Sequence, residues 1–233
     1  MIRVFIGTES AQWLPTEVLK RSILARTDAD VSFHELKDIS LNLKLKMFTG
    51  FSFYRFCIPQ ECRFEGRAIY LDADMVVFDD IRNLAEMEMG GHGVLAKRYT
   101  DESYHTSNLL MDCSKLKHWN VREWVALINA GLLDYRRMMV AGSGTPIFED
   151  FGILPDSWNN LDGFDEETKL IHYTNVPMQP WKRAGHPHAD LFLREMRATL
   201  DDGIITEEEI QREIASKHIY PEILQDMHKA TVG

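Results

Sequence analysis

The sequence predicts an α/β fold with a mainly parallel central sheet. Strand-like and helix-like segments alternate along most of the chain, which is the pattern of a sheet whose neighbouring strands are joined through helices. With 45% hydrophobic and 27% charged residues, the composition is that of an ordinary globular protein, and disordered and fibrous classes are excluded. A chain of 233 residues forms one large domain or at most two small ones.

The first elements are a strand, a helix and a second strand. The apolar residues 4–6 end at Gly7, which predicts a short strand followed by a loop. Pro15 is typical of the first turn of a helix, and apolar residues recur behind it at helical spacing, at Val18, Leu19 and Ile23. Residues 31–36 largely alternate between apolar and polar types, as a second strand does.

The middle of the chain continues this alternation. We expect, in order, a helix at 53–58, strands at 69–71, 93–96 and 109–111, and an amphipathic helix at 121–131 that Gly131 closes. Residues 136–165 are rich in Gly, Pro and Asp, and we expect them to form loops around a site.

The last part of the chain is predicted to be helical. Thr206 and Glu209 have the spacing of a capping box, so we expect a helix at 206–217. We divide the sequence into a single domain over 1–185, which carries the functional site, and a helical C-terminal extension over 186–233 that packs on the same domain.

The net charge and the cysteines exclude several classes of protein. Lys+Arg 26 against Asp+Glu 36 gives −10, so we expect no nucleic-acid partner, because nonspecific binding of nucleic acid needs a basic surface. Cys57, Cys62 and Cys113 have the spacing of neither a disulfide scaffold nor a zinc ribbon. The first apolar run is too short for a signal peptide, and no run of about 18 apolar residues occurs. We expect a cytoplasmic protein, and peripheral association with the inner face of a membrane stays open.

The segment 67–77 carries the clearest chemical signal. Its apolar strand runs into Asp72-Ala73-Asp74, and the carboxyl ends of strands are where open α/β sheets bind ligands. With one residue between them, the two carboxylates share one side of an extended chain. Paired carboxylates bind Mg²⁺ or Mn²⁺, which keep positions open for phosphate oxygens. The pattern therefore favours a divalent cation that bridges an acidic protein and an anionic ligand.

The alternative is that Asp72 and Asp74 only end the strand as turn residues. The apolar residues 75–77 follow directly, so two carboxylates without partners would lie inside an apolar segment, at a cost in free energy. We therefore favour the metal site.

A second informative segment covers residues 170–182. His172 ends another apolar strand, where a neutral imidazole would supply a third metal ligand; the alternative is a hydrogen-bonded core histidine. Prolines fix the turn that follows. After it, Trp181 would offer a flat apolar face and Lys182 a cation near a sugar phosphate, or Trp181 is only a packing anchor.

Five segments occur in a recognisable order over most of residues 1–185. They are Gly7-Thr8-Glu9 after the first strand, Phe53-Tyr54-Arg55-Phe56 with Arg55 17 residues before Asp72, Asp72-Ala73-Asp74 itself, Leu154-Pro155-Asp156-Ser157-Trp158-Asn159, and His172 followed by Gln179-Pro180-Trp181. In this order and spacing they resemble family 8 glycosyltransferases, the group that includes glycogenin and bacterial galactosyl- and glucosyltransferases.

The resemblance implies a GT-A type, Rossmann-like fold and a nucleotide-sugar donor, usually a UDP-hexose. It also implies transfer with retention of the anomeric configuration. The ion would be Mn²⁺ or Mg²⁺, held by Asp72, Asp74 and His172. It would stabilise the charge of the departing diphosphate.

The resemblance also assigns the donor-binding residues. The segment Gly7-Thr8-Glu9 would hold the uracil and ribose, and Arg55 would contact the sugar or the phosphates. Ala73, Trp181 and Lys182 complete the donor-binding set. For Arg55 the alternative is a structural pairing with a carboxylate.

The sequence departs from the family pattern in two places. Where family members carry a lysine before Pro-Trp, this chain has Gln179, so either Lys182 substitutes for that lysine or phosphate binding is weaker. The Asp-Gln-Asp cluster of the family is missing, so the residue that faces the anomeric carbon is not assigned by the resemblance. We predict Asn108 and Asn159 as catalytic residues, and Glu149 and Asp150 are further candidates.

The leading prediction is thus a retaining, metal-dependent hexosyltransferase. Its donor would be UDP-glucose or UDP-galactose, and its acceptor a hydroxyl of a glycan, a lipid-linked molecule or a small molecule. One alternative is a non-catalytic nucleotide-sugar-binding protein of the same fold. A haloacid-dehalogenase-type phosphatase also has a strand ending in Asp-x-Asp, but it needs the pair near the amino terminus. Pairing of two chains as a homodimer stays open.

Overall fold

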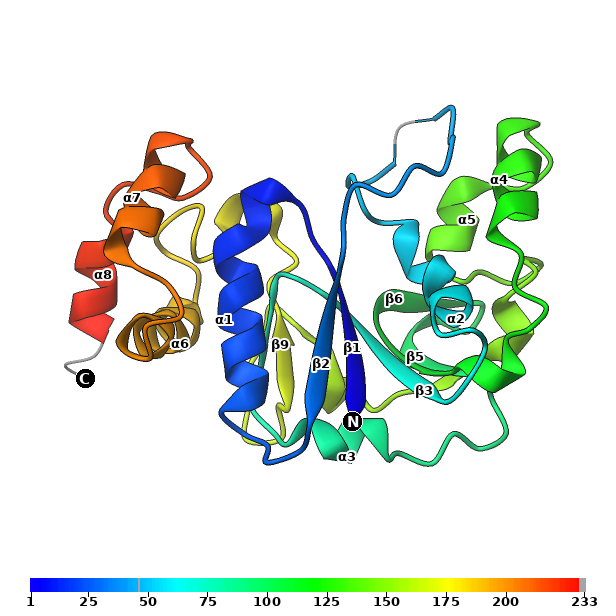
Figure 1. Cartoon of the computed structure of the whole chain (residues 1–233), viewed down its shortest axis with the longest axis horizontal. Helices are drawn as coiled ribbons and strands as arrows, with labels where there is room; N and C mark the ends of the chain where they lie inside the picture. The colour runs from blue at the N-terminus through cyan, green and yellow to red at the C-terminus, as the bar shows by residue number, and fades with distance from the viewer. Residues whose placement is uncertain (46, 231–233) are drawn as a thin grey trace. The chain divides into compact units, whose positions relative to one another are not determined.

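The computed structural model describes residues 1–45 and 47–230, and Figure 1 shows the path of the chain. Contacts divide the chain into two compact units that interleave along the sequence. Unit 1 consists of Met1–Glu9, Ala29–Asp72 and Arg82–Trp158, and unit 2 of Ser10–Asp28, Ala73–Ile81 and Asn159–Gly233.

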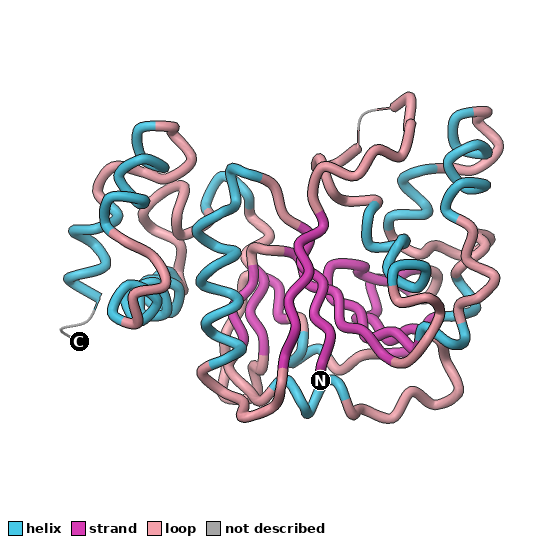
Figure 2. Tube along the Cα trace, viewed as in Figure 1, coloured by secondary structure: helices cyan, strands magenta, loops and turns pink. Residues whose placement is uncertain are grey.

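Unit 1 is built on a six-stranded sheet, whose strands are magenta in Figure 2. The strand order is β2-β1-β3-β6-β5-β7, with β1 Ile2–Gly7, β2 Val31–Leu36, β3 Arg67–Asp72, β5 Val94–Thr100, β6 Ser103–Asp112 and β7 Phe151–Ile153. Strand β1 is parallel to both of its neighbours and β5 is parallel to β7, whereas β6 is antiparallel to β3 and β5. The predicted α/β class with a mainly parallel central sheet is confirmed, and β6 is the strand that departs from it.

Helical segments and aromatic side chains complete unit 1. A 3₁₀ turn, Tyr54–Cys57, leads into α2, Ile58–Glu61; α3 is Ile81–Ala85, α4 is Val121–Asn129 and α5 is Tyr135–Met139. The ring of Phe56 meets Trp119 and Trp124 edge to face, with centroid distances of 5.9 and 6.2 Å. Phe56 shares one buried apolar cluster with Tyr70 of β3, and this packing brings the segment that carries Arg55 to that strand.

The described residues of unit 2 form a small sheet and four α-helices. The sheet has the order β4-β9-β8, with β4 Met75–Val77, β9 Leu170–His172 and β8 Asn160–Leu161. The helices are α1 Trp13–Leu24, α6 Ala189–Asp201, α7 Glu207–Ala215 and α8 Ile223–Ala230. Apolar side chains from strands and helices form one core, which includes Val18, Ile171 and Phe192. Within residues 1–45 and 47–230, no helix has the length and apolar character that a membrane span needs.

Most of the predicted elements are present in the structure. The capping box is confirmed, since Thr206 Oγ1 accepts the Glu209 N–H and the Glu209 carboxylate accepts the Thr206 N–H, and the helix that follows ends at Ala215. Gly131 lies just after α4 with φ +72°, a conformation that favours glycine. Residues 136–165 are not only loops, because they contain β7, β8 and most of α5. Elements of five residues or fewer are too short to show a periodic pattern.

The predicted division at residue 185 stays a prediction. Helices α6, α7 and α8 belong to the same unit as α1, β4 and β9, which precede residue 186. The side chain of Glu195 on α6 joins two arginines at the end of α1: Arg21 Nη1 lies 2.9 Å from Glu195 Oε2, and Arg26 donates to Glu195 Oε1. Glu195 is buried, so this ion-pair cluster fixes α6 on α1.

Replacing Glu195 by Ala should lower the free energy of unfolding by about 2–3 kcal/mol, because two partly buried guanidinium groups lose their shared partner. The matched control on the same helix is Asp201→Ala, which removes an exposed pair with Arg197 and should cost no more than about 0.5 kcal/mol. Urea denaturation followed by circular dichroism measures both. Equal losses for the two variants would show that the cluster does not fix α6.

Candidate functional site

The predicted site residues fall into two groups, one in each unit. Unit 1 holds Gly7, Thr8, Glu9, Arg55, Asp72 and Asn108. Unit 2 holds Ala73, Asp74, Asn159, His172, Trp181 and Lys182. The chain passes from one unit to the other between Asp72 and Ala73, so the Asp-x-Asp motif itself is shared.

In unit 1, Asp72 ends β3 beside the end of β1. The register of these parallel strands places Gly7 opposite Asp72. A Cβ atom at Gly7 would lie 2.1 Å from the Tyr70 hydroxyl and 2.7 Å from the Phe51 ring, so no larger residue fits there without displacing them. Glycine at this position therefore lets the Tyr70 hydroxyl reach the carboxylate of Asp72, to which it donates a hydrogen bond.

Arg55 is the second partner of Asp72. Its Nη2 donates to Asp72 Oδ1 at 3.1 Å, and its guanidinium lies 4.6 Å from the centroid of the Tyr70 ring. The other nitrogens donate to the Ser52 carbonyl at 2.8 Å and to the carbonyl and hydroxyl of Thr106. Arg55 is only 4% exposed. The pairing with a carboxylate that the sequence left as an alternative is present, and contact with a donor stays a prediction.

Asn108 lies on β6, opposite Leu71 of β3. Its side chain is buried, and its Nδ2 donates to the carbonyl of Trp158. Within the part of the chain that the structure describes, its Oδ1 has no hydrogen-bond partner. Thr8 is buried just after β1, with its N–H 3.4 Å from the Leu36 carbonyl, and Glu9 is exposed.

The two further candidates, Glu149 and Asp150, lie in a 3₁₀ turn of unit 1. Asp150 Oδ2 accepts the indole N–H of Trp119 at 2.7 Å and lies 2.9 Å from His118 Nε2. These contacts give Asp150 a structural role in holding Trp119.

In unit 2, Asp74 and His172 meet across the small sheet. Asp74 directly precedes β4, and His172 ends β9, which is antiparallel to β4. The Tyr173 N–H donates to the Asp74 carbonyl at 2.9 Å and extends this pairing. As a result, His172 Nε2 lies 3.1 Å from Asp74 Oδ1, and both side chains are largely buried.

Asn159 contacts the second ring nitrogen of His172. Its Oδ1 lies 3.2 Å from His172 Nδ1, where an amide oxygen can accept a proton carried by Nδ1; a neutral ring held in this way would present Nε2 to Asp74 as a ligand atom. The distance from Nε2 to Asp74 Oδ1 is that of an ion pair, yet Asp74 Oδ1 makes no hydrogen bond with any described residue. With a neutral ring, a lone pair of Nε2 would face this carboxylate oxygen, an arrangement that fits a cation between them, since two acceptors alone repel each other.

Gln179 holds the other oxygen of Asp74. Its Nε2 donates to Asp74 Oδ2 at 2.8 Å and to the Tyr173 carbonyl at 2.9 Å, and the side chain is 1% exposed. The sequence showed Gln179 only as the replacement of a phosphate-binding lysine. Its contact with Asp74 crosses 105 positions of the chain, and no local pattern indicates it.

The structure shows Trp181 in its packing role. The side chain is 0% exposed, with ring centroids 4.9 Å from Phe192 and 6.2 Å from Tyr173, so it presents no open face to a sugar. Lys182 is exposed, and no ion pair links it to any residue in the described ranges. Ala73 is fully buried between the two aspartates.

Comparisons with known proteins define the fold. No family model matches the sequence. Protein CDI of Arabidopsis thaliana is 24% identical, over 83% of this chain and 85% of its own length. Among solved structures, the bifunctional glycosyltransferase WbbM has a TM-score of 0.65 at 14% identity, covering 84% of this chain and 49% of its own.

Two further solved glycosyltransferase structures are similar to this chain in fold. The galactosyltransferase LgtC, in complex with donor and acceptor sugar analogues, has a TM-score of 0.64 at 15% identity and covers 84% of this chain and 96% of its own. The glycosyltransferase GlyE of Streptococcus pneumoniae has a TM-score of 0.65 at 17% identity. The match covers 94% of this chain and 64% of the GlyE chain. The chain thus spans about half of WbbM and 64% of GlyE. At these identities the likeness is one of fold: the chain has the GT-A fold of glycosyltransferases, as the sequence predicted.

Replacing Gln179 by Leu should lower the free energy of unfolding by about 1–3 kcal/mol, because Asp74 Oδ2 and the Tyr173 carbonyl lose a buried donor. Gln211→Leu, at an exposed position on α7 of the same unit, is the control and should change it by about 0.5 kcal/mol or less. Chemical denaturation measures both. If the two variants are equally stable, the Gln179 contacts do not support the site.

Asp162 should contribute pH-dependent stability next to His172, whose carbonyl accepts the Asp162 N–H. Burial alone would raise the pKa of Asp162, but donors from Thr174, Asn175 and His186 lower it below the ordinary value. A depressed folded-state pKa gives stability that is present above the unfolded-state pKa and lost as pH falls through the folded-state pKa. Asp162→Asn should therefore be less stable than wild type at pH 7, and the difference should shrink below pH 3.8. A difference that is constant from pH 7 to pH 3 in denaturation experiments would contradict this.

Proposed function

We propose that the protein is a metal-dependent glycosyltransferase that moves a hexosyl group from a nucleotide-sugar donor to an acceptor hydroxyl. One observation carries the proposal. A buried carboxylate oxygen of Asp74, with no hydrogen bond to any described residue, lies 3.1 Å from Nε2 of His172 in a protein with the GT-A fold.

The residues present fit a divalent cation. Asp72, Asp74 and His172 each offer one ligand atom, and only Ala73 separates the two aspartates in the chain. A buried carboxylate oxygen without a partner costs about 1–3 kcal/mol or more, which a bound cation would offset. Carboxylate oxygens are ligands for Mn²⁺ and Mg²⁺, and these ions keep positions open for phosphate oxygens. We propose Mn²⁺ or Mg²⁺ as the cofactor.

The surrounding side chains would hold these ligands in place. Tyr70 and Arg55 donate to Asp72, Gln179 donates to Asp74, and Asn159 Oδ1 lies 3.2 Å from Nδ1 of His172. Such partners orient ligands before the metal binds, and their loss typically lowers metal affinity about 10–100-fold. When bound, the cation would stabilise the negative charge that develops on the departing diphosphate.

The proposed donor is a UDP-hexose, UDP-glucose or UDP-galactose, and transfer would retain the anomeric configuration. The loop Gly7-Thr8-Glu9 at the end of β1 would hold the uracil and ribose. Lys182, exposed and without an ion pair in the described ranges, supports a contact with phosphate. The Asn108 amide oxygen accepts no hydrogen bond from a described residue, which supports Asn108 as the polar group facing the anomeric carbon. The contact with His172 supports Asn159 as a positioning residue. The acceptor would be a sugar, lipid-linked or small-molecule hydroxyl.

Asp74→Asn should weaken Mn²⁺-dependent binding of UDP at least 10-fold, because the metal loses one charged ligand. Asp201→Asn, at an exposed position on α6, should bind as wild type does. Isothermal titration calorimetry measures UDP affinity with and without Mn²⁺. Unchanged Mn²⁺-dependent affinity in Asp74→Asn would contradict the metal site.

Hydrolysis of UDP-glucose and UDP-galactose in the presence of Mn²⁺ separates an enzyme from a binding protein of the same fold. We expect slow release of UDP from at least one of the two donors by wild type and none by Asp74→Asn. Donor binding without any turnover would favour the non-catalytic alternative.

A further inference from the structure

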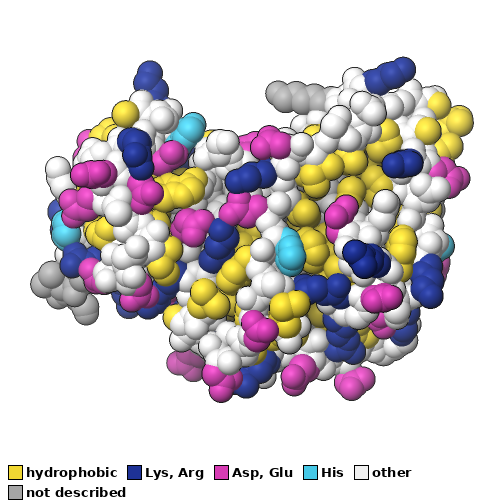
Figure 3. Space-filling model, in the orientation of Figure 1, with side chains coloured by type: hydrophobic (Ala, Val, Ile, Leu, Met, Phe, Trp, Pro, Cys, Tyr) yellow, Lys and Arg dark blue, Asp and Glu magenta, His cyan; other side chains and the backbone are white. Residues whose placement is uncertain are grey.

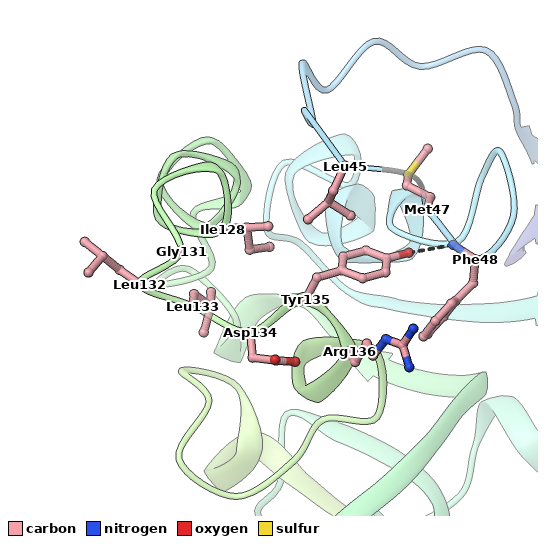
Figure 4. Close-up of a pocket in the computed structure, with 10 residues that line it drawn as sticks. All are labelled: Leu45, Met47, Phe48, Ile128, Gly131, Leu132, Leu133, Asp134, Tyr135 and Arg136. Atoms are coloured by element: carbon pink, nitrogen blue, oxygen red, sulfur yellow. Dashed lines mark hydrogen bonds between the residues drawn. The ribbon is translucent and has the colours of Figure 1, made fainter.

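Unit 1 contains a cavity of about 850 Å³ that no predicted site residue lines. It lies between the loop after β2 and the segment that joins α4 to α5, as Figure 4 shows. Its size is within the range of small-molecule sites, roughly 300–1,000 Å³. The lining residues are Leu45, Met47, Phe48, Ile128, Gly131, Leu132, Leu133, Asp134, Tyr135 and Arg136.

Most of the lining is apolar and part of it is open to solvent. Phe48 is 57% exposed and Leu132 is 76% exposed. Figure 3 shows hydrophobic side chains gathered on the surface over this part of unit 1. Exposed apolar side chains that share one cavity are typical of a binding site, because folding alone would favour burying them.

The lining of the cavity contains a cation, Arg136. Arg136 lies over the ring of Phe48, 5.9 Å from its centroid, and no described residue forms an ion pair with it. The carboxylate of Asp134, also in the lining, is engaged at the start of α5, where it accepts the Arg137 N–H at 2.7 Å. In a chain with a net charge of −10, an arginine that lies beside an apolar wall and has no ion pair with a described residue favours a ligand with both an apolar and an anionic part.

A chain of contacts within unit 1 joins the cavity to Asp72. The Phe48 N–H donates to the Tyr135 hydroxyl at 3.0 Å, a bond drawn in Figure 4, and this hydroxyl lies 3.4 Å from Ser52 Oγ. The Ser52 carbonyl accepts from Arg55 Nε, and Arg55 in turn holds Asp72. The wall of the cavity and one proposed metal ligand are therefore fixed by the same side chains.

We propose that this cavity is the acceptor subsite, and that the acceptor is an amphiphile whose apolar chain lies against Phe48 and Leu132 and whose anionic group faces Arg136. The assignment rests on the proposed function, because it names the acceptor class of that reaction. In the transfer, the acceptor hydroxyl oxygen forms a bond to the hexosyl C1 as the C1–O bond to the diphosphate breaks. The nucleoside diphosphate leaves with the electron pair and takes up the hydroxyl proton.

Decyl phosphate is a probe of this chemistry, used below its micelle concentration in calorimetric titrations. We expect it to bind wild type at least 10-fold more tightly than inorganic phosphate or neutral decyl glucoside does. Arg136→Gln and Leu132→Ser should each weaken it at least 5-fold. The matched controls Arg122→Gln and Ile153→Ser change an exposed arginine and an exposed apolar residue of unit 1 outside the cavity, and should bind as wild type does.

Two results would overturn the ligand class: decyl phosphate binding no tighter than inorganic phosphate, or unchanged affinity in Arg136→Gln and Leu132→Ser. Repeating the titration with saturating UDP and Mn²⁺ tests the acceptor role. This role requires that decyl phosphate still binds, because donor and acceptor occupy an enzyme together, and displacement by UDP would overturn it. If UDP and Mn²⁺ do not bind at all, the proposed function fails and the acceptor role with it, whereas decyl phosphate binding still reports on the cavity.

Discussion

The site depends on how the carboxylates of Asp72 and Asp74 are held. Asp72 ends the strand β3, and Asp74 directly precedes the buried strand β4. A buried carboxylate is costly unless donors or a cation compensate its charge. In unit 1 the hydroxyl of Tyr70 and the guanidinium of Arg55 compensate Asp72, and in unit 2 Gln179 holds one oxygen of Asp74. The second oxygen of Asp74 has no donor among the described residues, and it faces His172. This imbalance is the feature that a divalent cation would resolve.

The packing around these carboxylates places the groups that compensate their charge. Gly7 leaves room for the Tyr70 hydroxyl, and the aromatic cluster that contains Phe56 places Arg55 against β3. In unit 2, the antiparallel pairing of β4 with β9 brings Asp74 to His172, although 98 positions separate them (172 minus 74) in the chain. Side chains that look like ordinary core residues thus determine where the charged groups lie.

The sequence predicted the fold class and the polar residues of the site because both leave local patterns: apolar strands, a capping box and the Asp-x-Asp pair at a strand end. For Asp72 it offered only a pairing of Arg55 with an unspecified carboxylate, and it did not predict the partners of Asp74. Gln179, Tyr70 and Asn159 act through contacts that depend on tertiary packing. The residues next to Trp181 in the sequence do not indicate whether its side chain is buried or exposed. The cavity beside Tyr135 was also missed, because its walls come from segments far apart in the chain, such as Phe48 and Tyr135, which are 87 positions apart.

We propose that His172 is a metal ligand, oriented by Asn159 and facing Asp74. Pulsed electron paramagnetic resonance of the Mn²⁺-loaded protein tests it most directly, since it detects a ¹⁴N nucleus bonded to the ion. The account predicts imidazole nitrogen coupling in wild type and its loss in His172→Gln, with the coupling retained in His186→Gln, a variant of another buried histidine of unit 2. Absence of nitrogen coupling in wild-type protein that binds Mn²⁺ would contradict the account.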